Sequence, residues 1–513
     1  MKVLLISACV CAALALAGYY IWFSSKETVD VGAVQTWSIQ STPQRAKAQN
    51  EYDVIVIGSG IGGLSCAALL AKSGFKVLVL EQHSQVGGYG SSYTRDGFTF
   101  TVGVEDVSGL WEQGMTSLLL HKLGLKKDDL FVLNSRLYTL GDKKIVLSGT
   151  KENFIEQLAQ VFPGEKQALE KFLHEAEQAI KQSHNKAEQA KQPYASWRAM
   201  SYQQKLDEFF KNKELKSLLC SLLGYSEIGV QPGQIPAHKT LHACLQYFLY
   251  GGYYPKGGPQ NFVNALKDVI EKSGSTVLTS CSVDQILVEY GQVTGVGADK
   301  QVFKSPIVVA NVNAKTTFLN LVPKGAIGQA FVDAIAELKM AKSACVVNFG
   351  VKMDLSHLPT LIKGLDIEHK IHMLINSNAD SSLAPKEMAS ISIITSGSYA
   401  ETPALGTPEY AQYKDDVAKK ALTQAEKIIP GLQAQVVVTD VLTPRSFERF
   451  TLMPEGALFG FAQPTGGKKR PYFKTPLKGL YLASASCTGG GVESAIAAGF
   501  VCAQDILSSV SYS

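Results

Sequence analysis

A glycine-rich turn between two apolar segments constrains this chain more than any other feature of its sequence. Residues 53–57, DVIVI, are a short β-branched run of the kind found in buried parallel strands. The turn GSGIGG follows directly, and the small and apolar run LSCAALLAKSG predicts a helix that ends at Gly74. A second apolar run, KVLVLE, closes at Glu81. This order predicts a βαβ unit and an α/β fold.

The spacing of the glycines in this turn is that of a dinucleotide-binding loop. Gly58 permits the tight turn, Gly60 lets a pyrophosphate approach the backbone, and Gly63 lets the helix pack closely on the strand. The free N–H groups at the start of the helix favour phosphate. The predicted loop site comprises Gly58, Ser59, Gly60, Ile61, Gly62 and Gly63.

An acidic residue ends the second predicted strand. Glu81 in that position accepts hydrogen bonds from the ribose hydroxyls of adenosine, and we include its neighbour Gln82 in the predicted site. A carboxylate there disfavours a 2′-phosphate, so FAD or NAD is expected rather than NADP.

Beyond Glu81, the string VLVLEQHSQVGGYGSSYTRDGFTFTVG carries a further glycine pair, Gly87 and Gly88. The string resembles the FAD-binding start of the phytoene desaturase, carotenoid isomerase and retinol saturase family. The resemblance implies that FAD is the cofactor and that the glycine pair lies against it. It also implies that the segment with Phe98, Phe100 and Gly103 leads into the active site.

Similar patches recur from about residue 50 to the C-terminus, with retinol saturase as the nearest branch. The resemblance implies that the backbone of Val283 meets the adenine end of FAD. It also implies that Gly491, Val492 and Glu493 start a helix beside the pyrimidine edge of the flavin.

Two positions depart from the family pattern. Ala485 stands on a predicted strand where the family usually has an aspartate, and Glu493 stands where it often has proline or a small residue. Glu493 has two interpretations that stay open. Its carboxylate lies near the flavin and disfavours an anionic reduced ring, or it only complements the helix dipole.

The resemblance implies a glutathione-reductase-like fold with a discontinuous FAD-binding domain, a substrate domain and a helical lid. The expected FAD-binding parts are residues 51–130, 265–320 and 441–513. Residues 131–264 are expected to form the helical substrate or lid region, and residues 321–440 the substrate domain.

The N-terminus predicts membrane attachment. After Lys2, the run from Val3 to Phe23 carries no charge and as a helix reaches about 31 Å, enough to span a bilayer. A cleaved signal peptide is the alternative, because Ala15-Leu16-Ala17 resembles a cleavage site. We expect residues 1–23 to be the anchor or signal, residues 24–50 a linker, and the protein to be single-pass. The membrane is the endoplasmic reticulum in a eukaryote or the inner membrane in a bacterium, on an undetermined side.

The region between the nucleotide-binding patches carries fewer signals of function. Residues 151–250 are expected to be mostly helical, and the leucine stripe in ELKSLLCSLLGY indicates core packing or a lid face. Glu105, Tyr253, Tyr254 and Lys256 are candidate acids or bases, and we assign no catalytic residue. His238 and His242 lack the carboxylate partner of a zinc motif, so no metal is predicted.

The chain is therefore predicted to be an FAD-dependent oxidoreductase that acts on carbon–carbon bonds of an apolar isoprenoid or polyene. No second dinucleotide motif is seen, so the electron donor or acceptor is not assigned. Its 49 basic and 45 acidic residues nearly balance, and nucleic acid is not an expected partner. The alternatives are an amine-oxidase-type flavoenzyme and a prenyl-binding escort protein without flavin turnover.

Overall fold

The computed structural model describes residues 50–147, 149–185, 187–221, 233, 235–365, 371–462 and 470–510. The predicted anchor or signal at residues 1–23, and the linker apart from Asn50, lie outside these ranges. Within them, no helix combines the length and the apolar character needed to cross a bilayer.

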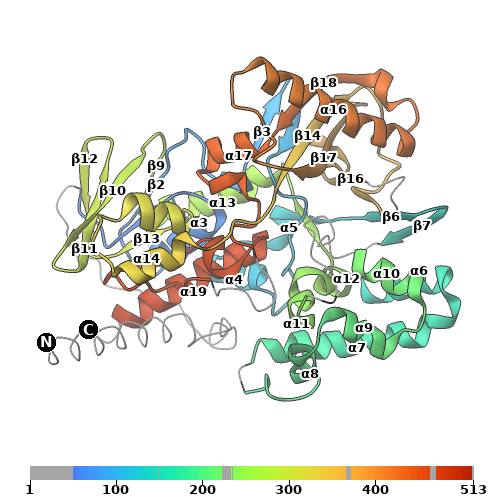
Figure 1. The fold of residues 1–513 in the computed structure, drawn as a ribbon, viewed down its shortest axis with the longest axis horizontal. Helices are drawn as coiled ribbons and strands as arrows, with labels where there is room; N and C mark the ends of the chain where they lie inside the picture. The colour runs from blue at the N-terminus through green and yellow to red at the C-terminus, as the bar shows by residue number, and fades with distance from the viewer. Residues whose placement is uncertain are drawn as a thin grey trace, which may run out of the picture.

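A five-stranded parallel sheet contains the predicted βαβ unit (Figure 1). β1 (Val54–Ile57) lies between β2 (Val77–Leu80) and β13 (Val308–Ala310). β9 (Thr276–Leu278) pairs with the outer side of β2, and β19 (Leu480–Leu482) with that of β13. All residues of β1 and β2 are buried, as their continuous apolar sequences require. Segments far apart in the sequence thus build one sheet.

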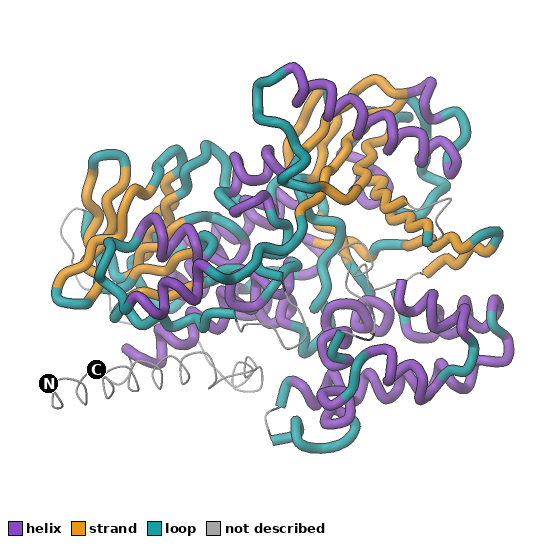
Figure 2. The backbone as a smooth tube through the Cα atoms, viewed as in Figure 1, coloured by secondary structure: helices purple, strands orange, loops and turns teal. Residues whose placement is uncertain are grey.

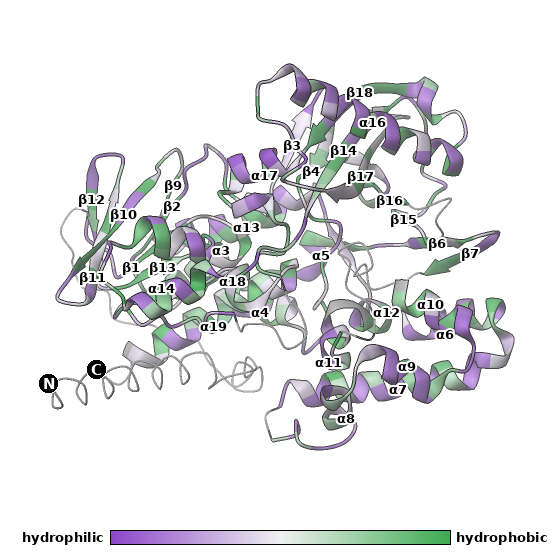
Figure 3. Cartoon of the chain, viewed as in Figure 1, coloured by the Kyte–Doolittle hydropathy of each residue, from purple (hydrophilic) through white to green (hydrophobic). Residues whose placement is uncertain are grey.

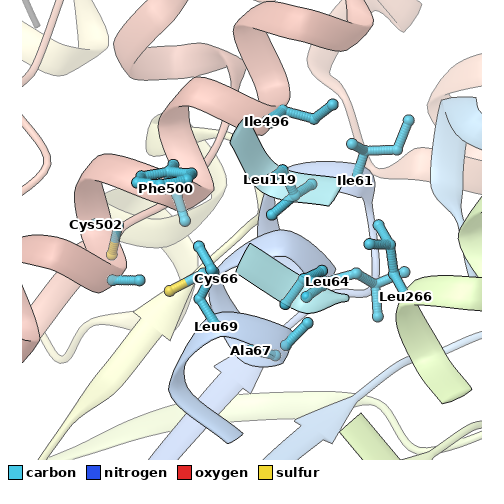
Figure 4. Close-up of a cluster of buried hydrophobic side chains, with 14 of the residues drawn as sticks. Ile61, Leu64, Cys66, Ala67, Leu69, Leu119, Leu266, Ile496, Phe500 and Cys502 are labelled. Carbon is cyan, nitrogen blue, oxygen red and sulfur yellow. The ribbon is translucent and has the colours of Figure 1, made fainter. Parts of the chain in front are cut away.

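Helices cover one face of this sheet through a shared apolar core (Figure 4). They are α3 (Ile61–Lys72), α4 (Met115–Leu123), α13 (Pro259–Lys272) and α19 (Val492–Val510). α3 and α19 approach closely because small residues face each other: a Cβ at Gly499 would lie 2.2 Å from the Gly62 carbonyl oxygen.

The opposite face is covered by an antiparallel three-stranded sheet and α14 (Gln329–Ala336). The strands are β10 (Val283–Glu289), β11 (Gln292–Ala298) and β12 (Gln301–Lys304). The parallel sheet is therefore buried on both faces, the arrangement in which parallel sheets normally occur.

A second, seven-stranded sheet has the order β18-β14-β17-β16-β15-β6-β7. Its pairs are antiparallel except for β15 and β6, and α16 (Pro408–Ile428) packs on it through Ala418, Ala421 and Ala425. The hairpin of β3 (Ser92–Arg95) and β4 (Phe98–Thr101) also packs against it, with Phe98 seated on Gly350. The strands are β6 (Arg136–Leu140), β7 (Lys143–Leu147), β14 (Ser343–Val351), β15 (Leu361–Gly364), β16 (Ile371–Ile375), β17 (Ala389–Gly397) and β18 (Val436–Leu442).

The predicted helical stretch at residues 151–250 is confirmed where the structure describes it, and its helices gather on one side of the molecule and pack against β6 and β7 of the second sheet (Figure 2). The main helices are α6 (Lys151–Val161), α7 (Lys166–Ser183), α9 (Tyr202–Phe209), α10 (Lys213–Ser221) and α12 (Gln246–Tyr250). Leu215, Leu218 and Leu219 are buried, so this part of the leucine stripe packs a core. The same helices carry polar residues on their other sides, as Figure 3 shows by colour.

Several expected boundaries differ from the observed elements. The boundary at 264/265 cuts α13, and that at 440/441 cuts β18, because each element continues across the expected boundary. Residues 131–264 are not helical throughout, since β6 and β7 join the second sheet and β5 (Phe131–Leu133) pairs with β8 (Tyr253–Pro255). The strand that was predicted to carry Ala485 is shorter than expected. It ends at Leu482, and Ala485 begins the short helix α18 (Ala485–Thr488).

Candidate active site

The glycine loop lies between β1 and α3, where the chain turns at the end of the parallel sheet. Gly58 has φ +89°, a conformation that favours glycine. A Cβ on Gly63 would lie 2.6 Å from the Gly58 carbonyl oxygen, and one on Gly60 would lie 2.6 Å from Asn311 Oδ1. Ile61 and Gly62 begin α3, whose start has no side-chain cap and no acidic residue. The backbone N–H groups there suit an anion such as pyrophosphate.

Ser59 and Glu81 join the loop to the end of β2. Glu81 Oε2 accepts hydrogen bonds from the Ser59 amide at 2.9 Å and from the Ser59 hydroxyl at 2.5 Å. Glu81 Oε1 accepts from the His83 amide at 2.9 Å. The side chain of the predicted residue Gln82 contacts His83, with Nε2 to Nε2 at 3.3 Å. The carboxylate is thus oriented by the protein and keeps acceptor capacity for a ribose hydroxyl.

The glycine pair, which the resemblance places against FAD, lies directly against this loop. Gly87 forms a β-bridge with Gly60, and its amide donates to Ser59 Oγ at 3.1 Å. A Cβ on Gly88 would find Gly60 Cα as its nearest neighbour, at 3.7 Å. Gly87 and Gly88 have φ +128° and +54°, so both favour glycine.

Val283 begins β10, close to the end of β2. Two residues earlier, the Cys281 amide donates to the Glu81 carbonyl oxygen at 2.8 Å. Val283 itself pairs with Ala298 across the small sheet. The structure therefore brings this backbone near the residue expected to hold the adenosine ribose.

At the far end of the loop site, Gly491 and Val492 lead into α19. Gly491 has φ +99°. The carboxyl of the following residue, Glu493, accepts hydrogen bonds from Ser108 Oγ at 2.7 Å and from the Met115 amide at 3.3 Å. Gln246 Nε2 donates to the same carboxyl. Burial raises the pKa of Glu493 despite these donors, which act to lower it.

The contacts of Glu493 add a role that its two sequence interpretations did not include. It connects α19 with the segment before α4 and with α12 in the helical region. A Cβ on Gly109 would lie 2.2 Å from Glu493 Oε1, so the carboxyl is closely enclosed. Sequence reasoning missed Ser108 and Gln246 because both are distant in the chain and belong to no motif.

Arg470 occupies the region of the missing aspartate. Its guanidinium donates to the carbonyl oxygen of Ala485, from Nη1 at 2.7 Å, and to that of Phe461. Burial lowers the pKa of Arg470 to about 10. The turn before α18 is therefore held by backbone carbonyls and an arginine, a residue that the sequence analysis did not single out.

A partly buried charged cluster joins the segment after β4 to the second sheet. Glu105 pairs with His372 on β16, and Lys363 Nζ on β15 lies 3.7 Å from the same carboxylate oxygen. Burial acts to raise the pKa of Glu105, but His372, Lys363 and Arg136 outweigh it and hold that pKa well below its usual range. The candidate acid is therefore an ionised partner of two bases.

Asp106 and Arg136 form the second pair of this cluster. The Arg136 guanidinium contacts the Asp106 carboxylate and lies 5.0 Å from the Tyr247 ring centre. The pair is half-buried to buried, with side-chain exposures of 12% and 5%. Tyr247 hydrogen-bonds Ser108 and lies near both Asp106 and Glu493, so it links the charged cluster to the start of α19.

The other candidates from the sequence have structural contacts. Tyr253 OH accepts from Lys127 Nζ at 2.8 Å, and Tyr254 OH donates to Asn376 Oδ1 at 3.2 Å. Lys256 Nζ donates to the Asp128 carbonyl oxygen. His242 hydrogen-bonds Ser183 rather than meeting His238. Among the described residues, no group of three ligating side chains could hold a metal ion.

These residues fit FAD. The uncapped helix start, the tight glycine positions and the oriented Glu81 carboxylate meet where β1 and β2 end, as a dinucleotide site requires. When bound, FAD supplies hydride chemistry at its flavin ring.

Comparisons with known proteins agree with this geometry. The family described as "Flavin containing amine oxidoreductase" matches residues 61–507. Prolycopene isomerase 2 of an Oncidium hybrid cultivar is 28% identical over 515 residues, covering 91% of this chain and 86% of its own. All-trans-retinol 13,14-reductase of Homo sapiens is 23% identical over 556 residues, covering 93% and 88%.

A solved structure shows the same fold. An oxidoreductase from Methanosarcina mazei superposes with a TM-score of 0.64 and 18% identity, over 89% of this chain and 100% of that one. The resemblance to the carotenoid isomerase and retinol saturase group, and the assignment of FAD as cofactor, are confirmed. The expected enzyme class is also confirmed, in contrast to the escort alternative. The chain is an FAD-dependent oxidoreductase and belongs to the flavin containing amine oxidoreductase family.

Proposed function

We propose that this enzyme acts on carbon–carbon single or double bonds of an apolar isoprenoid or polyene. Prolycopene isomerases and all-trans-retinol 13,14-reductases are its relatives over about nine-tenths of the chain. Saturation, desaturation and redox-neutral isomerisation all fall within this proposal. The glycine loop, Ser59, Glu81 and the Gly87–Gly88 pair hold FAD, and the start of α19 adjoins the flavin ring.

The observation that carries the proposal is the state of the carboxylates around the start of α19. Glu105 and Asp106 are paired with basic side chains, and Glu493 is enclosed by three hydrogen-bond donors. A cationic amine requires an unpaired anion or a comparable partner in a buried site. In the described part of this region, these carboxylates are already paired with basic side chains or hydrogen-bond donors. The arrangement favours an uncharged, apolar substrate over an amine.

The protein's own groups are suited to orientation rather than to proton transfer. Glu105 is held ionised by His372 and Lys363, and Arg136 is held by Asp106. Groups fixed in such pairs position the walls of a site and exclude water. Saturation or desaturation of a carbon–carbon bond transfers one hydride and one proton, and the placement that these groups provide serves the hydride step.

The test is a spectroscopic titration of the purified full-length protein. We expect a yellow protein with the two-banded spectrum of oxidised flavin. Under anaerobic conditions, a polyene that is oxidised would bleach these bands, whereas a panel of primary amines would leave them unchanged. For saturation, the chemically reduced enzyme would regain the yellow bands on adding polyene. Bleaching by an amine and by no polyene would refute the proposal.

We further propose that residues 1–23 attach the enzyme to a membrane, in the endoplasmic reticulum of a eukaryote or the inner membrane of a bacterium. The charge-free run from Val3 to Phe23 supports this, together with the apolar substrate class. Full-length protein should stay in the membrane pellet after alkaline carbonate extraction, and its intact mass should include residue 1. Loss of the first residues by cleavage would identify a signal peptide instead.

A further inference from the structure

Trp111, His184 and Tyr250 form a compact group at the edge of the helical region, in which His184 is buried and the other two are partly buried. Trp111 stacks on Tyr250 with ring centres 4.4 Å apart, and its edge meets His184 at 5.4 Å. His184 follows the end of α7, Tyr250 ends α12, and Trp111 precedes α4. The ring of His242 lies 5.2 Å beyond His184.

The polar atoms of this group have no hydrogen-bond partner within the described part of the chain. They are Trp111 Nε1, both ring nitrogens of His184 and the hydroxyl of Tyr250. His184 is only 5% exposed. Leaving such a group unpaired costs about 1–3 kcal/mol, so buried polar atoms are nearly always satisfied. Several unpaired polar atoms close together indicate a binding place for a polar group of a ligand. Water would occupy this place when the ligand is absent.

This group is connected to the candidate active site. Gln246, one turn before Tyr250, donates to the Glu493 carboxyl at the start of α19 and to the His242 carbonyl oxygen. The amide oxygen of Gln246 is also buried without a described partner. The segment directly before α12, Leu241–Leu245, is a π-helix, a form that recurs at functional sites.

The chemistry of the group is neutral. Burial, assisted by His242, lowers the pKa of His184 to about 3, and burial raises that of Tyr250 above its usual value. Neutral imidazole and phenol each donate and accept, and indole donates. A hydroxyl also donates and accepts, whereas a hydrocarbon end satisfies none of these atoms. A carboxylate would lack the cation that a buried charge needs.

We propose that Trp111, His184 and Tyr250 bind the hydroxyl group of a polyene or isoprenoid alcohol. This inference rests on the proposed function and narrows its substrate class, since it assigns a polar end to the substrate. The three side chains are binding residues at the end of the molecule away from the reacting bond.

The test compares binding of all-trans-retinol with that of its methyl ether, which has the same polyene but no donor. The FAD-loaded full-length protein is titrated anaerobically, and ligand fluorescence reports the Kd. We expect the wild type to bind the alcohol more tightly. Tyr250→Phe removes only the phenol oxygen and should weaken alcohol binding about fivefold, with little change for the ether.

His184→Phe should have the same selective effect. His174→Phe is the matched control, because His174 lies on α7 and is exposed. An unchanged melting temperature of Tyr250→Phe shows that the variant is folded. Equal weakening of both ligands, or no change in either, would overturn the end-group site while the proposed function stands. Failure of the wild type to bind either ligand would also overturn the end-group site, whereas the proposed function is overturned by the amine result of the spectroscopic titration.

Discussion

Glu81 accepts two hydrogen bonds from Ser59, one from its backbone amide and one from its hydroxyl, both to the same carboxylate oxygen. The end of β2 is thereby attached to the glycine loop by the protein's own hydrogen bonds. Preorganised acceptors of this kind bind with less loss of side-chain freedom, so the contact bears directly on FAD affinity.

Glu81→Gln should weaken FAD retention. The amide keeps the shape but replaces an acceptor by a donor that faces the Ser59 amide, at a cost of about 1–3 kcal/mol. The ratio of flavin to protein absorbance after dialysis would measure the loss. Glu387→Gln is the control, because Glu387 is 80% exposed and its ion pair with Lys386 is on the surface. Equal flavin content in both variants would contradict a cofactor role for Glu81.

Gly63→Ala should destabilise the protein. The new methyl would lie 2.6 Å from the Gly58 carbonyl oxygen, which is backbone and cannot move freely. We expect a loss of about 1–3 kcal/mol in the free energy of unfolding, seen as a lower melting temperature. Gly297→Ala is the matched control, because a Cβ at that position would have no neighbouring atom within 4 Å. A similar small effect in both would show that the close packing of α3 on the loop is not rigid.

Arg136→Met should be among the most damaging single changes. It leaves the Asp106 carboxylate without its cation in a mostly buried place, which costs about 3–5 kcal/mol. Lys272→Met breaks the exposed pair with Asp268 and should change stability by less than about 1 kcal/mol. Urea unfolding of both variants measures the difference. Adding Asp106→Asn to Arg136→Met should restore part of the loss, because it removes the unpaired charge.

Acidification should destabilise the helical region through His184 and His242. Burial lowers the pKa of His184 to about 3 and that of His242 to about 4. Between their ordinary pKa near 6.5 and these values, the unfolded chain binds protons that the folded chain does not. Folding stability therefore falls as the pH falls, by roughly 1.4 kcal/mol per pH unit for each group.

Removing one of these imidazoles should flatten that dependence. In urea unfolding between pH 6.5 and 4.5, His184→Phe should lose stability less steeply than the wild type. His174→Phe should follow the wild type, since its side chain is exposed on the same helix. An equal slope in all three proteins would show that His184 is protonated in the folded state.

The nucleotide-binding half of the fold was predictable because its signals are local. Gly58, Gly60 and Gly63 mark the turn, and the apolar runs beside them mark β1 and β2. The helical stretch at 151–250 was also predictable from its periodicity. By contrast, the expected domain boundaries at 264/265 and 440/441 fell inside α13 and β18, because helix and strand signals do not indicate to which domain an element belongs.

The residues of the candidate site also divide into those that local sequence predicts and those that it does not. Ser59, Glu81 and the glycine pair Gly87–Gly88 follow one another within a short stretch, where strand and turn geometry restrict their positions. Arg136, His372 and Gln246 had no such signal, since an isolated basic or amide residue in a sequence does not indicate its partner. Their meeting with Asp106, Glu105 and Glu493 depends on how three separate parts of the molecule pack.

The sequence by itself determined the βαβ unit and the start of α19, because each depends on backbone conformation within a few turns of chain. Glu81 disfavoured NADP, and the choice of FAD over NAD came from the resemblance to a known family. Only the tertiary structure decided that Glu105 is an ionised partner of two bases and that Glu493 is enclosed by Ser108, Met115 and Gln246. The physical reason is that charge state and hydrogen bonding depend on burial and on neighbours brought together by packing. Glycine spacing carries no information about either.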